Sequence, residues 1–206
     1  MATHVATKSP QATYADLEAV PAHLVAEILF GELVTHPRPV PAHSITAISL
    51  AEELVGPFQK SKGGPGGWIF MTEPELHLGA DVVVPDLAGW RRERLHALPE
   101  TAWIETAPDW VCEVLSPATE KYDRGEKRLI YAAAGVNYLW LVDPRPQALE
   151  AFELTEGKWL LLATLTGGDA VSVAPFDVIE FSLQLLWPFE QPAADDAASE
   201  NPANET

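Results

Sequence analysis

The stretch DWVCEVLSP, residues 109–117, decides how the fold is read. Apolar side chains at almost every position are typical of a strand that is covered on both faces, because both rows of side chains then meet apolar partners. Glu113 lies in the middle of this strand. A buried carboxylate is paired with a cation, binds a metal or takes up a proton, since an unpaired buried charge costs on the order of several kcal/mol or more.

Segments with helical patterns and segments with strand patterns alternate on both sides of this strand. A short helix capped by Thr13 is expected before a hairpin or bent strand over 26–37, which brings Glu27 and Glu32 close to each other. Ile45, Ile48, Ala51 and Val55 then recur at helical spacing, flanked by Leu50 and Leu54, until Gly56-Pro57 ends the helix. The other expected elements are strands over 68–79, 81–90 and 137–144, a helix over 121–135, a hairpin over 147–165, and a last strand that runs into a short helix over 177–187.

This order predicts an α/β protein with a mixed central sheet flanked by helices. With 206 residues and 47% hydrophobic content, the chain suits a single domain, which we expect over 13–188. Residues 1–12 are expected to form a flexible leader. Residues 189–206, which carry nothing apolar larger than alanine after Phe189, are expected to form a disordered acidic tail.

The charge balance narrows the possible partners. Thirty acids against 13 bases give a formal net charge of -17, which argues against loose, sequence-independent adhesion to nucleic acid or anionic membranes. Cys112 is the only cysteine, so neither an intrachain disulfide nor a zinc thiolate site is expected. No stretch is long and apolar enough for a membrane span, and the simplest expectation is a soluble cytoplasmic protein without membrane partners.

Two acids in otherwise apolar strand contexts are the candidates for chemistry. Asp86 ends the run VVVPD, and Glu113 lies in WVCEVL. Successive strands are usually neighbours in a sheet, so the two carboxylates are expected to lie close together. Two adjacent carboxylates repel each other, and a divalent cation relieves that repulsion. Ligands that offer only oxygen select a hard ion, which indicates Mg²⁺ or Mn²⁺.

Lys127 is the third candidate. The helix that follows the Glu113 strand carries it back over the end of that strand, on the same face as Ile130 and Tyr131. It could orient an attacking water or screen the charge that develops on a phosphate. The alternative is an i, i+4 ion pair with Asp123, worth about 0.3 to 0.5 kcal/mol at a surface.

Three segments together resemble the Uma-type family of bacterial restriction-endonuclease-like proteins, a branch of the PD-(D/E)XK nuclease superfamily. They are FGELVTHPRPVPAH, VVVPDLAGWRRERL and APDWVCEVLSPATEKYDRGEKRLIYAAAGVNYLWLVDP, and the resemblance spans residues 13–188 in order. It implies a restriction-endonuclease-like α/β/α core with an additional antiparallel hairpin. It also implies phosphodiester hydrolysis at a divalent metal held by an Asp and a Glu on adjacent strands.

By this resemblance Asp86 and Glu113 are the metal-binding acids, and the backbone carbonyl of Val114 adds a ligand. The superfamily pattern places lysine two positions after the Glu, where this chain has Leu115. The resemblance to this branch implies that the lysine comes instead from the following helix, which matches Lys127. It also implies an additional catalytic acid from an early GEL motif, which matches Glu32.

Nine of the 13 bases lie in three windows next to the strands assigned to the site, as expected if they contact phosphates. The first prediction for function is therefore a Mg²⁺-dependent endonuclease that acts on DNA. A homodimer is the predicted oligomeric state. Two alternatives stay open, namely a non-catalytic or regulatory protein on a nuclease scaffold and a metal-assisted hydrolase of a small phosphorylated substrate. The windows are Lys60 and Lys62; Arg91, Arg92 and Arg94; and Lys121, Arg124, Lys127 and Arg128.

Overall fold

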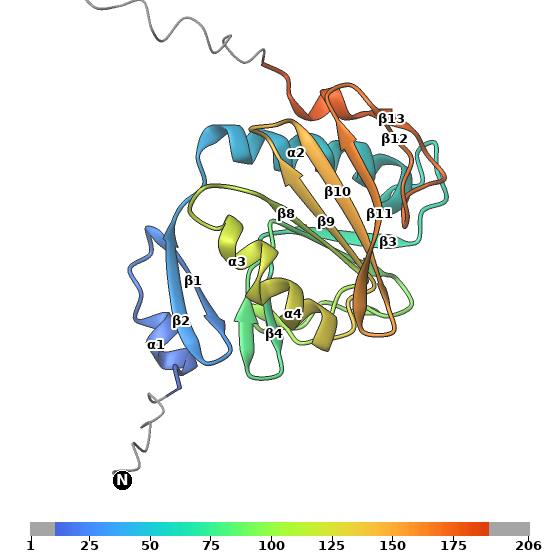
Figure 1. The fold of residues 1–206 in the computed structure, drawn as a ribbon. Helices are drawn as coiled ribbons and strands as arrows, with labels where there is room; N and C mark the ends of the chain where they lie inside the picture. Colours follow the sequence, from blue (N-terminus) through green and yellow to red (C-terminus); the bar gives the residue numbers. More distant parts are fainter. Residues whose placement is uncertain (1–10, 190–206) are drawn as a thin grey trace, which may run out of the picture.

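The computed structural model describes residues 11–189 (Figure 1). The leader predicted over 1–12 and the acidic tail predicted over 189–206 lie almost entirely outside the described residues. Both stay predictions, as does the single domain over 13–188. Within the described part of the chain, no helix is both long and apolar enough to cross a membrane.

A six-stranded mixed sheet forms the centre of the fold, in the order β11-β10-β9-β8-β6-β3 (Figure 1). Strand β8 pairs in parallel with β9, and the other neighbours in this sheet are antiparallel. The predicted mixed α/β class is therefore confirmed, and β10 and β11 form the additional hairpin. The strands are β3 (Trp68–Thr72), β6 (Leu87–Arg91), β8 (Trp110–Val114), β9 (Tyr138–Asp143), β10 (Ala148–Thr155) and β11 (Lys158–Thr166).

Strand β8 is buried over its whole length, as the opening stretch predicts. Its side chains alternate between two hydrophobic clusters, one on each face of the sheet. Trp110 and Cys112 belong to the cluster on the α2 side. Val111 and, beyond the strand end, Leu115 belong to the cluster that includes the α4 residues. Glu113 points to the same side as Val111, because side chains two positions apart in a strand share a face.

Helix α2 (Pro41–Leu54) covers one face of this sheet, and the turn η1 (Val55–Gln59) prolongs it. The helix is where the periodicity places it, and Leu50 and Leu54, which flank the predicted stripe, are buried, but the stripe itself is not the contact face. Its buried residues are His43, Thr46, Leu50 and Leu54, while Ile48 is 63% exposed. Two overlapping stripes fit a helical period in this segment, and the sheet beneath decides which one packs. Gly56-Pro57 does not end the helical segment, because η1 continues it as a wider turn.

A second, five-stranded sheet has the order β2-β1-β5-β4-β7. The sequence predicts one strand over 68–79 and one over 81–90, whereas each run breaks in two. The outer halves, β3 and β6, join the central sheet, and the inner halves, β4 and β5, pair in the second one. Pro85 lies at the crossing between sheets, where the missing N–H interrupts no ladder. The strands are β1 (Leu24–Leu29), β2 (Glu32–Pro37), β4 (Glu75–Leu78), β5 (Asp81–Val83) and β7 (Trp103–Ile104).

The remaining elements are short. Thr13 caps α1 (Tyr14–Glu18) as predicted, with Asp16 completing a capping box. The predicted helix over 121–135 is interrupted at Gly125, which separates α3 (Glu120–Arg124) from α4 (Glu126–Ala133). Figure 1 shows α3 and α4 on one side of the central sheet and α2 on the other. The others are β12 (Ala170–Val171), β13 (Phe181–Ser182) and η2 (Leu183–Leu186).

Gly89→Ala is expected to destabilise the protein by about 1–3 kcal/mol. A Cβ at Gly89 in β6 would lie 2.9 Å from Phe70 Cε1 and 3.2 Å from Trp110 Cε3, inside a packed aromatic core. Urea denaturation measures the change. Gly56→Ala is the control, because no heavy atom lies within 4 Å of a Cβ there. Equal stability of the two variants would contradict the packing argument.

Candidate active site

Asp86 and Glu113 lie side by side where the two sheets diverge. Leu87 of β6 pairs with Cys112 of β8, so Asp86, just before β6, stands beside Glu113. Asp86 Oδ2 accepts a hydrogen bond of 2.7 Å from the Val114 N–H. The structure thus brings together the two acids that the sequence selects, from adjacent strands.

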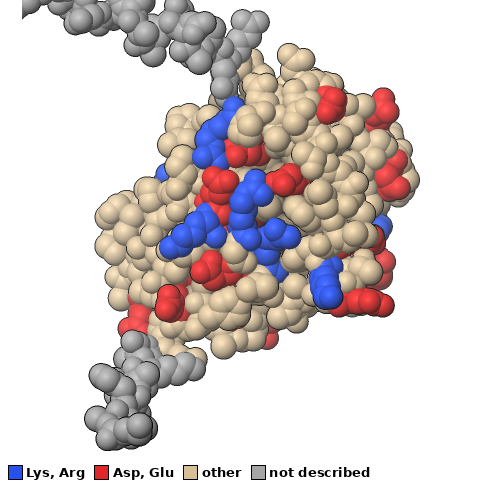
Figure 2. Space-filling model, viewed as in Figure 1, with Lys and Arg blue, Asp and Glu red and all other residues tan. Residues whose placement is uncertain are grey.

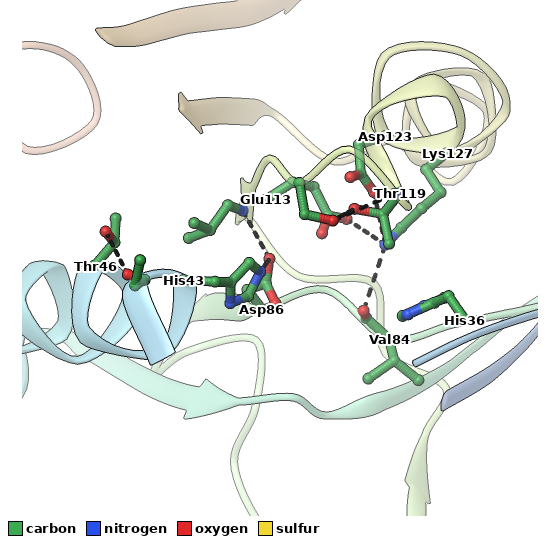
Figure 3. A network of polar contacts seen from close by, with 12 residues as sticks. His36, His43, Thr46, Val84, Asp86, Glu113, Thr119, Asp123 and Lys127 are labelled. Carbon is green, nitrogen blue, oxygen red and sulfur yellow. Dashed lines mark hydrogen bonds and ion pairs between the residues drawn. The ribbon is translucent and has the colours of Figure 1, made fainter. Parts of the chain in front are cut away.

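The Lys127 ammonium is the cation that compensates Glu113. Its Nζ lies 2.9 Å from Glu113 Oε1, 3.2 Å from Glu27 Oε1 and 3.3 Å from Asp123 Oδ1. It also donates to the Val84 carbonyl at 3.4 Å, and Figure 3 shows it directed from its helix toward Val84. The Asp123 pair that the sequence offered as an alternative role is present together with the contact to Glu113. Both occur in a buried cluster instead of at a surface.

The additional acid in this cluster is Glu27, and the expectation for Glu32 is corrected. The β1–β2 hairpin forms as predicted, but Glu32 pairs with Leu29 beside the turn and is exposed. Glu27 is 2% exposed and accepts a hydrogen bond of 2.8 Å from the Val84 N–H. The same signal that singled out Glu113, a charge inside an apolar strand, also marks Glu27 in LVAEIL.

Burial and mutual repulsion set the protonation of these acids. Burial raises the pKa of Glu113 well above its ordinary value; the charge of Lys127 opposes this, and the nearby acids reinforce it. Burial also raises the pKa of Asp123, against the charge of Lys127. For Glu27, burial is outweighed by Lys127, His36 and the Val84 N–H, so its pKa is lowered. The single positive charge of Lys127 therefore does not compensate all three carboxylates around it.

Lys127 itself stays protonated. Burial disfavours its charge, but the surrounding acids, with Glu113 and Glu27 first, raise its pKa well above the ordinary value. Tyr131 adds a neutral donor, because its hydroxyl donates to Glu113 Oε1 at 2.5 Å. Burial, followed by the charge of Glu113, raises the pKa of that hydroxyl. The sequence pattern indicates Tyr131 only as a member of the apolar helix stripe, whereas its hydroxyl also holds the Glu113 carboxylate.

His43 fixes the other acid. Its Nε2 lies 3.1 Å from Asp86 Oδ2, the oxygen that also accepts from Val114 (Figure 3). Burial opposes the charged imidazole, but the hydrogen bond and the charge of Asp86 outweigh it and raise the pKa of His43. No feature of the local sequence identifies His43, because its role depends on α2 crossing the end of β8.

A narrow cavity of about 30 Å³ opens onto this cluster, with Asp86, Glu113, Asp123 and Lys127 in its walls. A wider cavity of about 260 Å³ adjoins it, and Asp86 and Val84 line both. The cluster is thus reached from solvent past Asp86.

The donor set fits a hard cation with few protein ligands. Asp86 Oδ1 and Glu113 Oε2 take no part in the hydrogen bonds and ion pairs that fix these two side chains. Among residues 11–189, no group of three or more His, Cys, Asp or Glu side chains is arranged to hold a metal. Mg²⁺ commonly binds through one or two carboxylates and otherwise uses water and substrate phosphate. Val114 enters the cluster through its N–H, and ligation by its carbonyl stays a prediction.

The basic windows do not form a free cationic groove. Figure 2 shows Lys and Arg gathered over the middle of one face but interleaved with Asp and Glu. Arg124 contacts Glu150 at 2.6 Å, and Arg94 contacts Asp109 at 2.7 Å. The Arg91 guanidinium lies 4.1 Å from the centre of the Trp68 ring. Of the nine bases in these windows, only Lys127 lines a cavity beside Asp86, and it lines the narrow one alone.

A mixed sheet with an Asp and a Glu on adjacent strands, and a lysine on the following helix, defines a restriction-endonuclease-like protein. Residues 12–185 match the model of the Uma2 family, described as "Putative restriction endonuclease". The chain therefore belongs to this family. Its fold is similar to that of a protein from Anabaena variabilis ATCC 29413, described as "a putative nuclease belonging to DUF820". The two share 19% sequence identity and a TM-score of 0.68, over 85% of this chain and 97% of the other. No curated protein matches this chain.

The pKa of His36 is expected to fall toward its ordinary value in Glu27→Gln. The contact with the Glu27 carboxylate, whose Oε2 lies 3.6 Å from His36 Nε2, outweighs burial and raises the pKa of His36. Protonated His36 thus stabilises the fold below the ordinary pKa of 6.5, and this contribution is lost as the pH rises through the raised value. An NMR titration of the imidazole signals measures the pKa of His36 in the wild-type protein and in Glu27→Gln, with His43 as the internal reference. An unchanged pKa of His36 would show that Glu27 does not raise it.

Proposed function

We propose that this protein is a metal-dependent endonuclease that hydrolyses phosphodiester bonds in DNA. The observation that carries this proposal is the meeting of Asp86 and Glu113 from adjacent strands beside a buried lysine, at the end of a solvent-connected cavity. Membership of a family described as restriction endonucleases supports the same reaction class. The predicted homodimer remains a prediction.

Asp86 and Glu113 would hold the Mg²⁺ or Mn²⁺ ion. When bound, such an ion polarises the phosphate and makes a nucleophile available from water at neutral pH. Lys127 keeps Glu113 oriented at 2.9 Å and limits the repulsion among the acids. His43 and the Val114 N–H both contact Asp86 Oδ2, so they orient this carboxylate.

Wild-type protein is expected to nick supercoiled plasmid in Mg²⁺ or Mn²⁺ and to lose this activity in EDTA. Asp86→Asn is expected to reduce the nicking rate by about 100-fold or more, because it removes one charge from the cation site. Asp177→Asn, which changes an exposed acid far along the chain, is the matched control. Undiminished nicking by a folded Asp86→Asn protein would contradict the assignment.

One observation favours the alternative of a non-catalytic protein on this scaffold. Lys127 already contacts three carboxylates, as it would in a purely structural cluster. Calorimetric titration with Mn²⁺ separates the two proposals. Binding that is weakened in Asp86→Asn supports the nuclease, and no binding at millimolar Mn²⁺ supports the scaffold protein.

A further inference from the structure

The wider cavity beside Asp86 is lined mostly by residues that take no part in the cluster of acids. It measures about 260 Å³ and lies between the segment around α1, the start of β1 and strand β4. Apolar side chains supply much of its wall, among them Leu17, Val20 and Val25. These side chains are only half-buried, so a flat apolar ring placed there would remove further apolar surface from water.

Carboxylates are the most numerous polar groups in the wall. Glu73 and Glu75 line the cavity together with Asp86, and the basic residues of its lining are Arg38 and His36. A continuous polyanion is repelled by such a wall, because each phosphate would approach carboxylates. The cavity therefore suits the uncharged part of a nucleotide better than its backbone.

Glu75 is held in one orientation. Its Oε1 accepts a hydrogen bond of 2.9 Å from the Tyr14 hydroxyl and lies 2.8 Å from His77 Nε2. Tyr14 and His77 are themselves fixed by edge-on and stacked contacts with the Trp103 ring. Burial and the hydrogen bond to Glu75 raise the pKa of Tyr14 to about 12, so its hydroxyl remains a donor at neutral pH. No hydrogen bond within residues 11–189 occupies the second oxygen, Oε2.

We propose that this cavity binds one unstacked nucleobase next to the scissile phosphate, and that it favours bases with an exocyclic amino group. The inference rests on the proposed nuclease function, because the cavity and the candidate metal site share Asp86 and Val84. An ionised carboxylate only accepts hydrogen bonds, so Glu75 selects donors. Guanine, adenine and cytosine carry exocyclic amino groups, whereas thymine carries none.

This arrangement also determines the preferred form of the nucleic acid. A base inside a duplex reaches such a cavity only by leaving the stack, which costs on the order of a few kcal/mol, and least in a strand that is already single. Single-stranded or frayed DNA is therefore the preferred substrate, and duplex DNA is expected to be cut more slowly. The excess of carboxylates over Lys and Arg among the lining residues agrees with recognition through the base.

Binding of single nucleotides to the metal-free, full-length protein tests the cavity without any turnover. In EDTA, dGMP and dCMP are expected to bind about tenfold more tightly than dTMP, as measured by ligand-observed NMR or calorimetry. Glu75→Gln is expected to remove this preference. Ala26→Phe fills the cavity from β1 and is expected to abolish binding, while Ala80→Phe, at an exposed turn outside the cavity, leaves it intact.

Cleavage of one labelled oligonucleotide, single-stranded and as a duplex, completes the test in Mg²⁺. We expect cleavage of the single strand to be at least about tenfold faster, and we expect Ala26→Phe to lose this advantage. Metal-dependent cleavage with no nucleotide binding and equal rates on both forms would overturn the base cavity and leave the nuclease proposal standing. Selective binding of dGMP and dCMP without any cleavage would support the cavity and overturn the nuclease proposal. Equal binding of dTMP would overturn the amino-base preference.

Discussion

Lys127→Met is expected to lower the free energy of unfolding by about 3–5 kcal/mol, since it removes one partner from a buried ion cluster. Methionine keeps most of the side-chain volume, so packing is nearly preserved and the loss is electrostatic. Three carboxylates, those of Glu27, Glu113 and Asp123, would remain without the ammonium that lies 2.9 to 3.3 Å from each of them. Urea denaturation followed by tryptophan fluorescence measures the change.

The size of this loss is expected to depend on pH. Burial and neighbouring acids already raise the folded-state pKa of Glu113, and removing the charge of Lys127 raises it further. A group with a raised folded-state pKa favours folding fully below its unfolded pKa, near 4.5 for Glu113. This contribution is lost as the pH rises through the folded-state value. The variant is therefore expected to be closer to wild type at pH 5 than at pH 8.

Lys121→Met is the matched control. Lys121 lies on α3 and is exposed, and within residues 11–189 its ammonium contacts only the Tyr122 ring, at 4.5 Å. Its replacement is expected to change the stability by less than about 0.5 kcal/mol. If the two variants lose equal stability, or if the loss in Lys127→Met does not depend on pH, the buried cluster does not have the energetics argued for it.

Glu113→Gln is expected to reduce metal-dependent nicking by about 100- to 10,000-fold. The amide has nearly the same shape, and its oxygen can still accept from Tyr131, but it no longer offers an anionic ligand. Because the carboxylate that it replaces is buried among other acids, losing its charge offsets the weakened contact with Lys127. The free energy of unfolding is therefore expected to change by less than about 1.5 kcal/mol.

Together these variants separate catalysis from stability. Glu113→Gln is expected to lose activity in a folded protein, whereas Lys127→Met is expected to lose both. Glu32→Gln, an exposed acid outside the cluster, serves as the control for Glu113→Gln and is expected to retain full activity. Full activity of Glu113→Gln would contradict the role of Glu113 in the metal site. A loss of activity in Glu32→Gln would contradict the placement of Glu32 outside the site.

The sequence is most informative where a feature depends only on local pattern and on neighbouring segments. The apolar stretch around Glu113 predicts a fully buried strand, and chain order predicts that the Asp86 segment lies next to it. Lys127 follows from helical spacing, since its position on the stripe with Ile130 and Tyr131 directs it toward the sheet. These features depend on periods of two and 3.6 residues, which the sequence displays directly.

Other features depend on packing between distant segments. Glu27 and Glu32 occupy the same hairpin, and only the docking of β1 against β5 and α4 places Glu27 next to Lys127. The apolar runs around Pro85 read as continuous strands, because nothing local shows that their halves pair in different sheets.

The sequence by itself determined the mixed α/β class, the buried strand of Glu113, the nearness of Asp86 and the family. The tertiary structure alone decided which early acid joins Lys127, which face of α2 packs and that His43 contacts Asp86. The physical reason is that periodicity fixes the direction of a side chain relative to its own element. The position of one element against another depends on complementary surfaces far apart in the chain.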